Sequence, residues 1–413
     1  MPSPRSSKPA ARRDPRPTLA ARVEAEARSS LRHAANRAAG HIGAREGVAV
    51  EVDGRVLRNF SGSDYLGLAQ HPEVIAGLQE SAAWLGVGAG LSHLSASGFR
   101  AQRELEDSIA QWQGYARGLM FGSAYVANLA VMQALLREGE ISVQDRHNHG
   151  SLVDAARLAG AEIHAYPHLA AEGAMRALRG RPQSAAMLAT HGIFALDGDM
   201  APLKMLAVLA RTENASLYVD DAHGTGVIGP DGRGSVAMAG LGEHEVPLQL
   251  ISLNRALGCA GAVLVGSQAL IEQITETARA YLYSSPPPPA LAAATSKALA
   301  LARGESWRRF KLAALVARLR RGAQQLGIDL MDSATAIQPL ILGSSSVTLA
   351  AARHLERAGF LVSAVRPPFV PDGRARLRIT LSAAHEEQDI DALLEALAEV
   401  VRRVSDESDE SDA

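Results

Sequence analysis

Two carboxylates and a histidine follow an apolar run in SLYVDDAH, residues 216–223. Asp220 and Asp221 end this run, and His223 comes three residues after Asp220. In open α/β sheets, ligands bind beyond the carboxyl ends of the strands. A carboxylate buried at that edge is costly unless it pairs with a cation or a protonated ring nitrogen. Asp220 is therefore a candidate to bind a protonated aromatic ring, and the structural alternative is an Asp that caps the following turn.

A second group of polar residues lies in QDRHNHG, residues 144–150. His147 and His149 would point to opposite faces of an extended chain, and no cysteine pair accompanies them. A zinc site needs ligands at helical or CxxC-like spacing, so we expect no metal here. The flat imidazole of His149 is better suited to cover one face of an aromatic ligand.

Small residues precede an expected helix in GSAYVANLA, residues 122–130. The unpaired N–H groups and the dipole at such a helix start favour a phosphate, here at Ser123, Ala124 and Tyr125. The structural alternative is that Ser123 only caps the helix.

Three arginines occur in RARLRITLS, residues 374–382. By strand alternation Arg376 and Arg378 share a face, and one of them can bind a carboxylate through two parallel hydrogen bonds. We expect the other two arginines to be solvated.

GTGVIG, residues 224–229, matches the dinucleotide pattern G-x-G-x-x-G. That pattern requires a helix after its third glycine. The continuation PDGRGS does not suit a helix, so these glycines are expected to form a turn.

The stretch ISLNRALGCAGAVLVG, residues 251–266, is typical of a strand, a tight loop and a second strand. It presents Ser252, Asn254 and Arg255. Arginine stays protonated in proteins and is a poor imine nucleophile. Amines are scarce elsewhere, because the chain has only four lysines: Lys8, Lys204, Lys297 and Lys311.

Alternating strands and helices would position these residues. Apolar runs of strand length occupy residues 140–146, 161–167, 185–191, 216–223, 248–253 and 261–266, and helices are expected at 100–112 and 125–137. This order predicts an α/β layer with a mostly parallel sheet. Residues 48–60 predict a hairpin that turns at Asp53-Gly54. The expected divisions are a disordered basic tail (1–20), an N-terminal helix and hairpin (21–60), a large domain (61–300), a small C-terminal α+β domain (301–404) and an acidic tail (405–413).

The composition limits the possible partners. The 413 residues carry a net charge of −2, which argues against nucleic acid as the main partner. The sequence contains no apolar run of about eighteen residues, so no membrane span is predicted. One cysteine, Cys259, excludes an internal disulfide and favours the cytoplasm.

Five longer motifs carry a family resemblance: SDYLGLAQHPEV, DGDMAPL, YVDDAHGTGVIGPDGRGS, IQPLI and VRPPFVPDGRARLRITLSAAH. From about residue 20 to 403 the chain resembles the α-oxoamine synthases, which are fold-type I, aspartate-aminotransferase-like enzymes dependent on pyridoxal 5′-phosphate (PLP). The resemblance is strongest to the branch that serves biotin biosynthesis. It implies decarboxylative condensation of L-alanine with a pimeloyl thioester by a homodimer whose sites lie at the subunit interface.

The resemblance also implies roles for individual residues. Asp220 would pair with the pyridine nitrogen of PLP, His223 would lie near its phenolic oxygen, and His149 would stack on its ring. The phosphate would be held by Ser123, Ala124, Tyr125 and Ser252. Arg378 would bind the amino-acid carboxylate, with Ser63 beside it.

Several positions depart from the family pattern. Arg255 stands where the family has the lysine that bonds covalently to PLP, which puts covalent attachment in doubt. Ser63 replaces an Asn, His191 a Glu and Ala195 a Ser. Three hypotheses follow: an acyltransferase that acts without this lysine; a catalytically silent member that binds PLP or partners an active paralogue; or an Arg255 introduced into an active parent. The last would not explain His191, Ala195 and Ser63.

Overall fold

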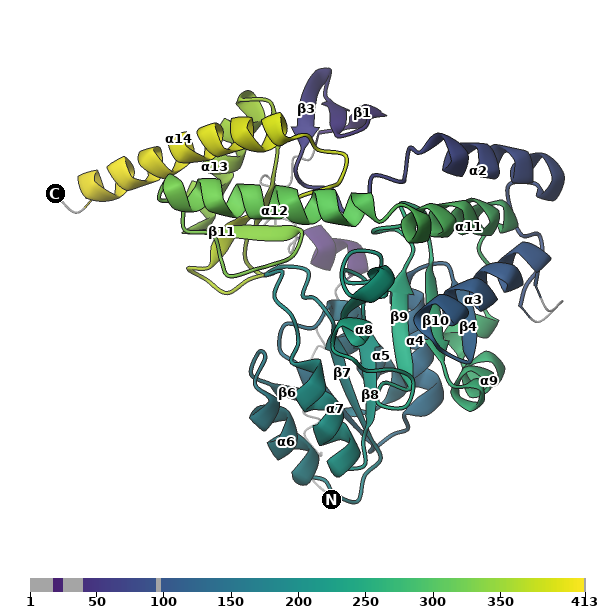
Figure 1. The fold of residues 1–413 in the computed structure, drawn as a ribbon. Coiled ribbons are helices and arrows are strands. Elements are labelled where there is room, and N and C mark those ends of the chain that lie inside the picture. The colour runs from purple at the N-terminus through teal and green to yellow at the C-terminus, as the bar shows by residue number, and fades with distance from the viewer. Residues whose placement is uncertain (1–17, 25–39, 94–97, 412–413) are drawn as a thin grey trace, which may run out of the picture.

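The computed structural model describes residues 18–24, 40–93 and 98–411. Residues 1–17 of the expected basic tail and most of the expected N-terminal helix lie outside these residues, whereas residues 19 and 20 are helical. Three sheets and the helices around them form the fold (Figure 1). Within the described ranges, no helix is long and apolar enough to cross a membrane.

The largest sheet has seven strands in the order β4-β10-β9-β8-β7-β5-β6. Its strands are β4 (Arg117–Phe121), β5 (Ile141–Asp145), β6 (Glu162–Tyr166), β7 (Ala186–His191), β8 (Ser216–Asp220), β9 (Leu248–Ser252) and β10 (Ala262–Gly266). The pairs among β9, β8, β7, β5 and β6 are parallel, whereas β10 is antiparallel to β4 and β9. The predicted mostly parallel sheet is confirmed, although strand β4 was not predicted.

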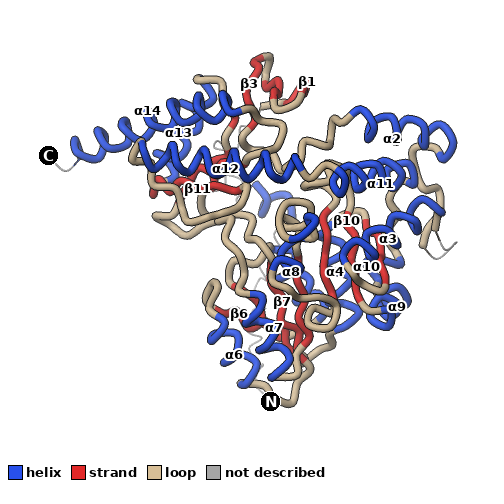
Figure 2. The backbone as a smooth tube through the Cα atoms, in the orientation of Figure 1, coloured by secondary structure: helices blue, strands red, loops and turns tan. Residues whose placement is uncertain are grey.

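Helices cover both faces of this sheet (Figure 2). Because side chains alternate along a strand, Leu250 packs on one face while its neighbour Ile251 packs on the other. The elements on the first face are α4 (Ala124–Leu135), α5 (Gly150–Ala159), α9 (Gln268–Thr277) and α10 (Arg279–Leu282). The elements on the other are α3 (Arg100–Gln113), α6 (Ala171–Arg179), α7 (Leu203–Thr212), the short η1 (Pro230–Gly232), α8 (Gly234–Met238) and α11 (Pro289–Gly304), which also packs against α2 (Pro72–Leu85).

The C-terminal part has its own three-stranded sheet in the order β11-β14-β13. Its elements are α12 (Trp307–Gln325), β11 (Ile337–Gly343), α13 (Ser345–Arg357), β12 (Phe360–Leu361), β13 (Ser363–Val365), β14 (Ala375–Thr380) and α14 (Glu387–Ser411). The last helix was expected to end near Val404, but α14 continues seven residues into the acidic segment.

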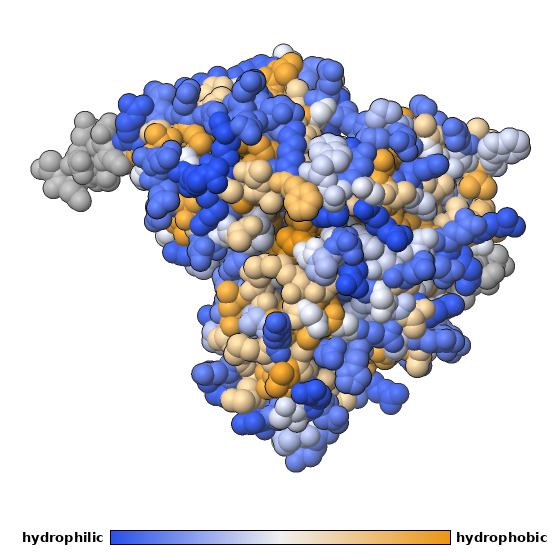
Figure 3. Space-filling view, viewed as in Figure 1, coloured by the Kyte–Doolittle hydropathy of each residue, from blue (hydrophilic) through white to orange (hydrophobic). Residues whose placement is uncertain are grey.

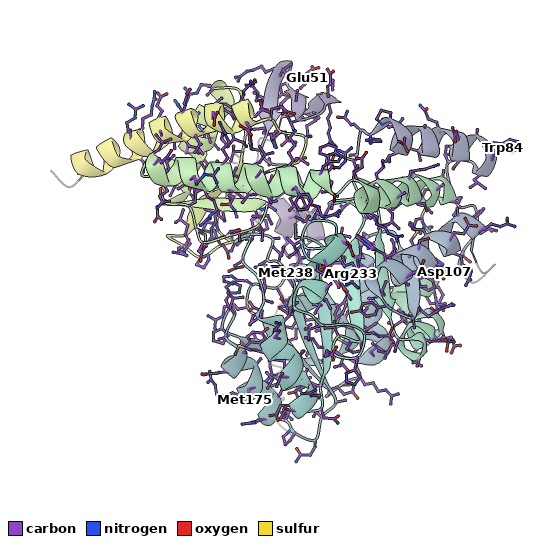
Figure 4. The ribbon with its side chains drawn as sticks, in the orientation of Figure 1. Glu51, Trp84, Asp107, Met175, Arg233 and Met238 are labelled. Atoms are coloured by element: carbon purple, nitrogen blue, oxygen red, sulfur yellow. The ribbon has the colours of Figure 1, made fainter. Side chains whose placement is uncertain are left out.

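The N-terminal hairpin joins this C-terminal part. Strands β1 (Ile42–Glu46), β2 (Ala49–Val52) and β3 (Arg55–Asn59) form an antiparallel sheet, and β3 also pairs in parallel with β12. The predicted turn is confirmed, since Asp53 and Gly54 both have the positive φ that a two-residue hairpin turn needs. Figure 4 shows Glu51 on this hairpin, well away from Trp84 at the end of α2.

An exposed apolar area lies on helices α6 and α7, at the other end of the molecule from the N-terminal hairpin. Met205 and Val208 of α7 are more than half exposed and line a groove of 490 Å³ with Met175 of α6. The surface over these helices is pale to orange in Figure 3, and Met175 is labelled there in Figure 4.

The central strands carry much of the stability. Leu250 in β9 has no exposed surface and lies between β8 and β10. We expect Leu250→Ala to lower the free energy of unfolding by about 2–5 kcal/mol, through lost burial and the cavity left behind. Urea unfolding followed by circular dichroism measures this, with Leu158→Ala, at an exposed position of α5, as the matched control. Equal loss in the two variants would contradict the prediction.

Candidate active site

The strand register gathers the candidate residues at one edge of the large sheet. His191 lies opposite Asp220 in the pair β7–β8, and Asp220 lies opposite Leu250 in β8–β9. Ser252 ends β9 opposite Ala262, which in turn lies opposite Phe121 at the end of β4. The ends of four strands, β4, β7, β8 and β9, therefore meet here, as expected for a ligand site in an α/β sheet.

Asp220 is a buried carboxylate, and among the described residues only neutral donors lie within hydrogen-bond distance of it. It is 3% exposed. The Asn128 amide donates to its Oδ2 at 3.0 Å, and the backbone N–H of Ala222 donates to its Oδ1 at 3.2 Å. His191 Nδ1 stands 3.8 Å from Oδ1, beyond a hydrogen bond. Asp220 thus does cap the following turn, while its negative charge lacks a close cation among the described residues.

A ring of polar contacts fixes the orientation of His149. Asn128 Nδ2 also donates to Ser151 Oγ at 2.8 Å, and this hydroxyl lies 2.8 Å from His149 Nδ1. The backbone N–H of Ser151 donates to the same nitrogen, while the backbone N–H of His149 donates to His191 Nε2. Burial lowers the pKa of His149, and the nearby His191 lowers it further. The His149 imidazole is therefore neutral, with its proton on Nε2.

His149 also has a structural role that was not predicted. Its side chain caps the N-terminus of α5 through the Ser151 N–H. The capping geometry holds the ring at the edge of the sheet next to Asp220. The pattern His-Gly-Ser before an apolar helix could have predicted this capping role. Polar side chains that accept a hydrogen bond from the second helical N–H are typical N-caps.

His223 belongs to a second chain of hydrogen bonds. The Tyr65 hydroxyl lies 2.7 Å from His223 Nδ1, and the positive charge of Arg378 lies close to the Tyr65 oxygen. The tyrosine proton therefore points to Nδ1. Burial lowers the pKa of His223 well below its usual value, and the charges of Arg255 and Arg378 lower it further. His223 is thus neutral, and Nε2 carries its proton.

The loop after β9 presents Arg255. Its Nη1 donates to Ser63 Oγ at 3.1 Å, and its Nε is buried without a hydrogen-bond partner among the described residues. Ser252 Oγ donates to Asn254 Oδ1 at 2.6 Å. Gly258 closes the loop at a positive φ, where a Cβ would lie 2.3 Å from the backbone nitrogen of Ala69. Only glycine fits this approach, so the loop has little freedom to move Arg255 away.

Ser123 caps α4, as the structural alternative stated. Its hydroxyl accepts from the N–H of Val126 at 3.2 Å. Ala124 and Tyr125 begin the helix, and the Tyr125 side chain turns outward to donate to Asp154 at 2.9 Å. The backbone N–H groups of this first turn have no partners within the helix, as at every helix start. A phosphate could therefore be bound by these N–H groups and by Ser123, but not by the tyrosine ring.

One expectation about the arginines is wrong. Arg376 was expected to be solvated if Arg378 bound the ligand, but it is 3% exposed and forms an ion pair with Asp197. The reason is a long-range contact: the face of β14 that carries Arg376 meets Asp197, which precedes it by 179 residues, so solvent does not reach the guanidinium. Arg378, on the same strand, donates from Nε to the backbone oxygen of Ala195 at 2.5 Å.

Asp221 stabilises the glycine-rich turn. It has no exposed surface and accepts hydrogen bonds from Ser235, Thr225 and Gln249. Burial raises the pKa of Asp221 to about 7. No helix follows GTGVIG directly, because a short η1 turn with a positive φ at Gly229 comes first. The two adjacent aspartates therefore have different tasks, Asp220 at the site and Asp221 in the scaffold.

His147 lies in a polar cluster that the sequence did not reveal. Its ring stacks on that of His168 with centroids 3.9 Å apart, and its Nδ1 is 3.1 Å from Asp197. His147, His168 and Asp197 lie close enough to hold a metal ion. However, both ring nitrogens of His168 already contact carboxylates, at 2.8 Å from Asp145 and 2.7 Å from Asp199. That arrangement requires an imidazolium, which cannot bind a metal.

His168 should make the stability depend on pH. Burial alone would lower its pKa, but hydrogen bonds to Asp145 and Asp199 raise the pKa of His168 to about 9. A pKa raised in the folded state gives stability that is complete below about 6.5 and lost as the pH rises through about 9. We expect urea unfolding to show wild type losing more stability than His168→Gln between pH 6.5 and 9.5. Parallel curves for the two proteins would contradict this.

The fold and site define a family. The family model for aminotransferase class I and II matches residues 56–397. The chain belongs to this family and, within it, is a relative of the α-oxoamine synthases.

Individual relatives place it more narrowly. It is 52% identical over 385 residues to the 8-amino-7-oxononanoate synthase of Xanthomonas axonopodis pv. citri, covering 93% of this chain and 96% of that protein. In structure it is similar to a serine palmitoyltransferase variant from S. paucimobilis with bound PLP and myriocin, with a TM-score of 0.88, 24% identity and coverage of 94% and 100%. It is also similar to the 8-amino-7-oxononanoate synthase of Francisella tularensis, with a TM-score of 0.74, 23% identity and coverage of 84% and 98%.

The residues at the sheet edge fit PLP, with one exception. The uncompensated charge of buried Asp220 matches a protonated pyridine nitrogen. The start of α4 and Ser252 lie at the same edge, where the first-turn N–H groups suit a phosphate. The exception is Arg255, which cannot form the covalent bond that lysine forms with the cofactor's aldehyde.

Proposed function

We propose that this chain is a PLP-dependent acyltransferase of the 8-amino-7-oxononanoate synthase type. The reaction joins L-alanine to a pimeloyl thioester and releases the free thiol and carbon dioxide, a step of biotin biosynthesis. The observation that carries the proposal is the 52% identity over 385 residues to proteins of that name, in a chain whose sheet edge brings Asp220, His149 and His223 together. The silent-member alternative receives no support from these relatives.

Specific residues would hold the cofactor. Asp220 would accept from the pyridine N–H, His149 would cover one face of the ring, and the start of α4 with Ser252 would bind the phosphate. When bound, PLP supplies an electron sink for the carbanion formed at the amino-acid α-carbon. Asp220 keeps the ring nitrogen protonated for this purpose.

The remaining residues would bind and orient the reactants. Arg378 would bind the substrate carboxylate, and Ser63 lies nearby on the turn that Arg255 contacts. Neutral His223 holds its proton on Nε2, directed by Tyr65, and can donate to an oxygen of the cofactor. A polar cavity of 180 Å³ adjoins Ser63 and Asn254, but Arg378 and Asp220 do not line it.

Arg255 sets the state of the cofactor. Without an amine at this position, PLP is held only by non-covalent contacts, and the proton carrier that lysine supplies is missing. We therefore propose a slow enzyme whose bound cofactor can be removed by dialysis.

The test is direct product analysis. Purified full-length protein is incubated with PLP, L-alanine and a pimeloyl thioester, and 8-amino-7-oxononanoate is measured by mass spectrometry. Product that requires both substrates and PLP supports the proposal. PLP binding without any product over long incubation would instead identify the catalytically silent alternative.

The assembly and location also remain proposals. We propose a homodimer in the cytoplasm, with residues 61–300 as the PLP-binding domain and 301–404 as the small domain. Analytical ultracentrifugation of the purified protein measures whether it is a dimer. If a second, different chain co-purifies and the mass equals one copy of each, the protein is a heterodimer with a paralogue.

A further inference from the structure

Two guanidinium groups are held by one short turn in the site. Arg255 Nη1 donates to Ser63 Oγ at 3.1 Å, and the charge of Arg378 lies close to the side chain of Tyr65, two residues further on. The backbone N–H of Tyr65 donates to the carbonyl of Ser63 at 2.9 Å, which keeps the turn tight. Both guanidinium groups are therefore fixed from the same side.

These two cations lack acidic partners within the described part of the chain. No ion pair there joins Arg255 or Arg378 to a carboxylate, and their described hydrogen bonds go to neutral oxygens of Ser63 and Ala195. Arg255 Nε is buried and has no acceptor. Burial lowers the pKa of Arg378, and the charge of Arg255 lowers it further. Two neighbouring half-buried cations without a counter-ion are unfavourable, and an anionic ligand would reduce that cost.

Tyr65 keeps this region from supplying its own anion. Burial raises the pKa of Tyr65, although both arginines act in the opposite direction. The phenol is therefore neutral near pH 7, and it donates its proton to His223 Nδ1. The missing negative charge must come from a bound molecule.

We propose that Arg255 and Arg378 form a two-arginine clamp for the carboxylate of a small organic acid, so that Arg255 is a substrate-binding residue. Planar guanidinium groups bind carboxylates through paired, charge-assisted hydrogen bonds. The free Nε of Arg255, next to its outer nitrogens, offers one such pair. This inference rests on the proposed function for its site, and it adds a ligand contact at a position where a lysine would instead bond to the cofactor.

Propionate separates carboxylate binding from chemistry. It has the carboxylate of alanine but no amino group, so it cannot react with PLP. Propionamide is its neutral counterpart. Each is titrated by ligand-observed NMR into the PLP-saturated full-length protein, in which the cofactor's own phosphate already fills its site. We expect propionate to bind and propionamide not to bind.

Two substitutions test the clamp. We expect Arg255→Met and Arg378→Met each to weaken propionate binding roughly 10- to 100-fold, the loss of a charge-assisted pair, with a strongly non-additive double variant. Arg157→Met, on an exposed arginine of α5, is the matched control and should leave the affinity unchanged. Circular dichroism and the retained PLP absorbance show that each variant is folded, and Arg255→Gln replaces Arg255→Met if the latter fails to fold.

The outcomes are distinct. Unchanged propionate affinity in Arg255→Met, with loss only in Arg378→Met, would overturn the clamp. Equal binding of propionate and propionamide would overturn it as well. Propionate binding that depends on Arg255, in a protein that forms no 8-amino-7-oxononanoate, would support the clamp and remove the proposed function.

Discussion

Arg255→Lys is expected to raise the rate of 8-amino-7-oxononanoate formation by about 10²- to 10⁴-fold. The range is the usual contribution of a positioned general acid–base group, and covalent activation by an amine adds to it. The loop is already shaped for the change, since Gly258 fixes its closure and Ser252 precedes it on the end of β9. A lysine at position 255 starts from the same Cα, and its ammonium group is smaller than the guanidinium that it replaces.

A spectroscopic signal accompanies this gain. The introduced amine should bond to the cofactor's aldehyde, give a visible absorption band, and be fixed by borohydride to a peptide that contains position 255. Wild-type protein should yield no such adduct at this peptide. Arg157→Lys on the exposed surface adds an amine elsewhere and is the matched control.

A different result would be equally informative. If Arg255→Lys forms the covalent bond but gains no activity, then Ser63, His191 or Ala195 limits the reaction. His191 is the first position to test, because its Nε2 accepts from the His149 backbone and its Nδ1 faces Asp220. If no covalent bond forms, the loop does not present position 255 to the cofactor.

The fold and the sheet-edge residues could be predicted from the sequence because their signals are local. Apolar runs with β-strand length predicted β5 to β10, and Asp53-Gly54 predicted the hairpin turn. Once the strands are parallel, their carboxyl ends must meet, so Asp220 and Ser252 could be placed at one edge before any coordinates. These inferences need only the spacing of apolar residues along the sequence and the direction of the strands.

The contacts between distant segments could not be predicted in this way. Arg376 was expected to be solvated because a single strand does not show that it will lie in the centre of a sheet opposite Asp197, 179 residues away. His168 likewise meets Asp145 and Asp199 only after three strands are ordered. Strand β4 was missed because ARGLMFG is short and has glycine inside it, and burial between α3 and β10 decides its conformation.

Asp220 and Asp221 allow a sharp test of which carboxylate serves the cofactor. We expect Asp220→Asn to weaken PLP binding by ~100- to 4,000-fold, because removing one member of a buried charge pair costs about 3–5 kcal/mol. Activity should fall at least as much, since a neutral partner no longer holds the pyridine nitrogen protonated. Equilibrium dialysis and PLP fluorescence measure the affinity. The melting temperature without PLP should change little. The amide can accept from only one of the two donors, Asn128 and Ala222, but the substitution also removes a buried charge without a close cation, and the two effects oppose each other.

Asp221→Asn should behave in the opposite way. Asp221 is buried in the scaffold, and its pKa of about 7 means that an amide resembles its protonated form. One oxygen must nevertheless become an NH₂ group among the donors Ser235, Thr225 and Gln249, which leaves donors unpaired and lowers stability by about 1–3 kcal/mol. The melting temperature should therefore fall while PLP affinity in the folded protein changes little. If instead Asp221→Asn abolished PLP binding and Asp220→Asn left it intact, Asp220 would be only the turn cap that its contact with Ala222 shows, and the ring nitrogen would need another partner.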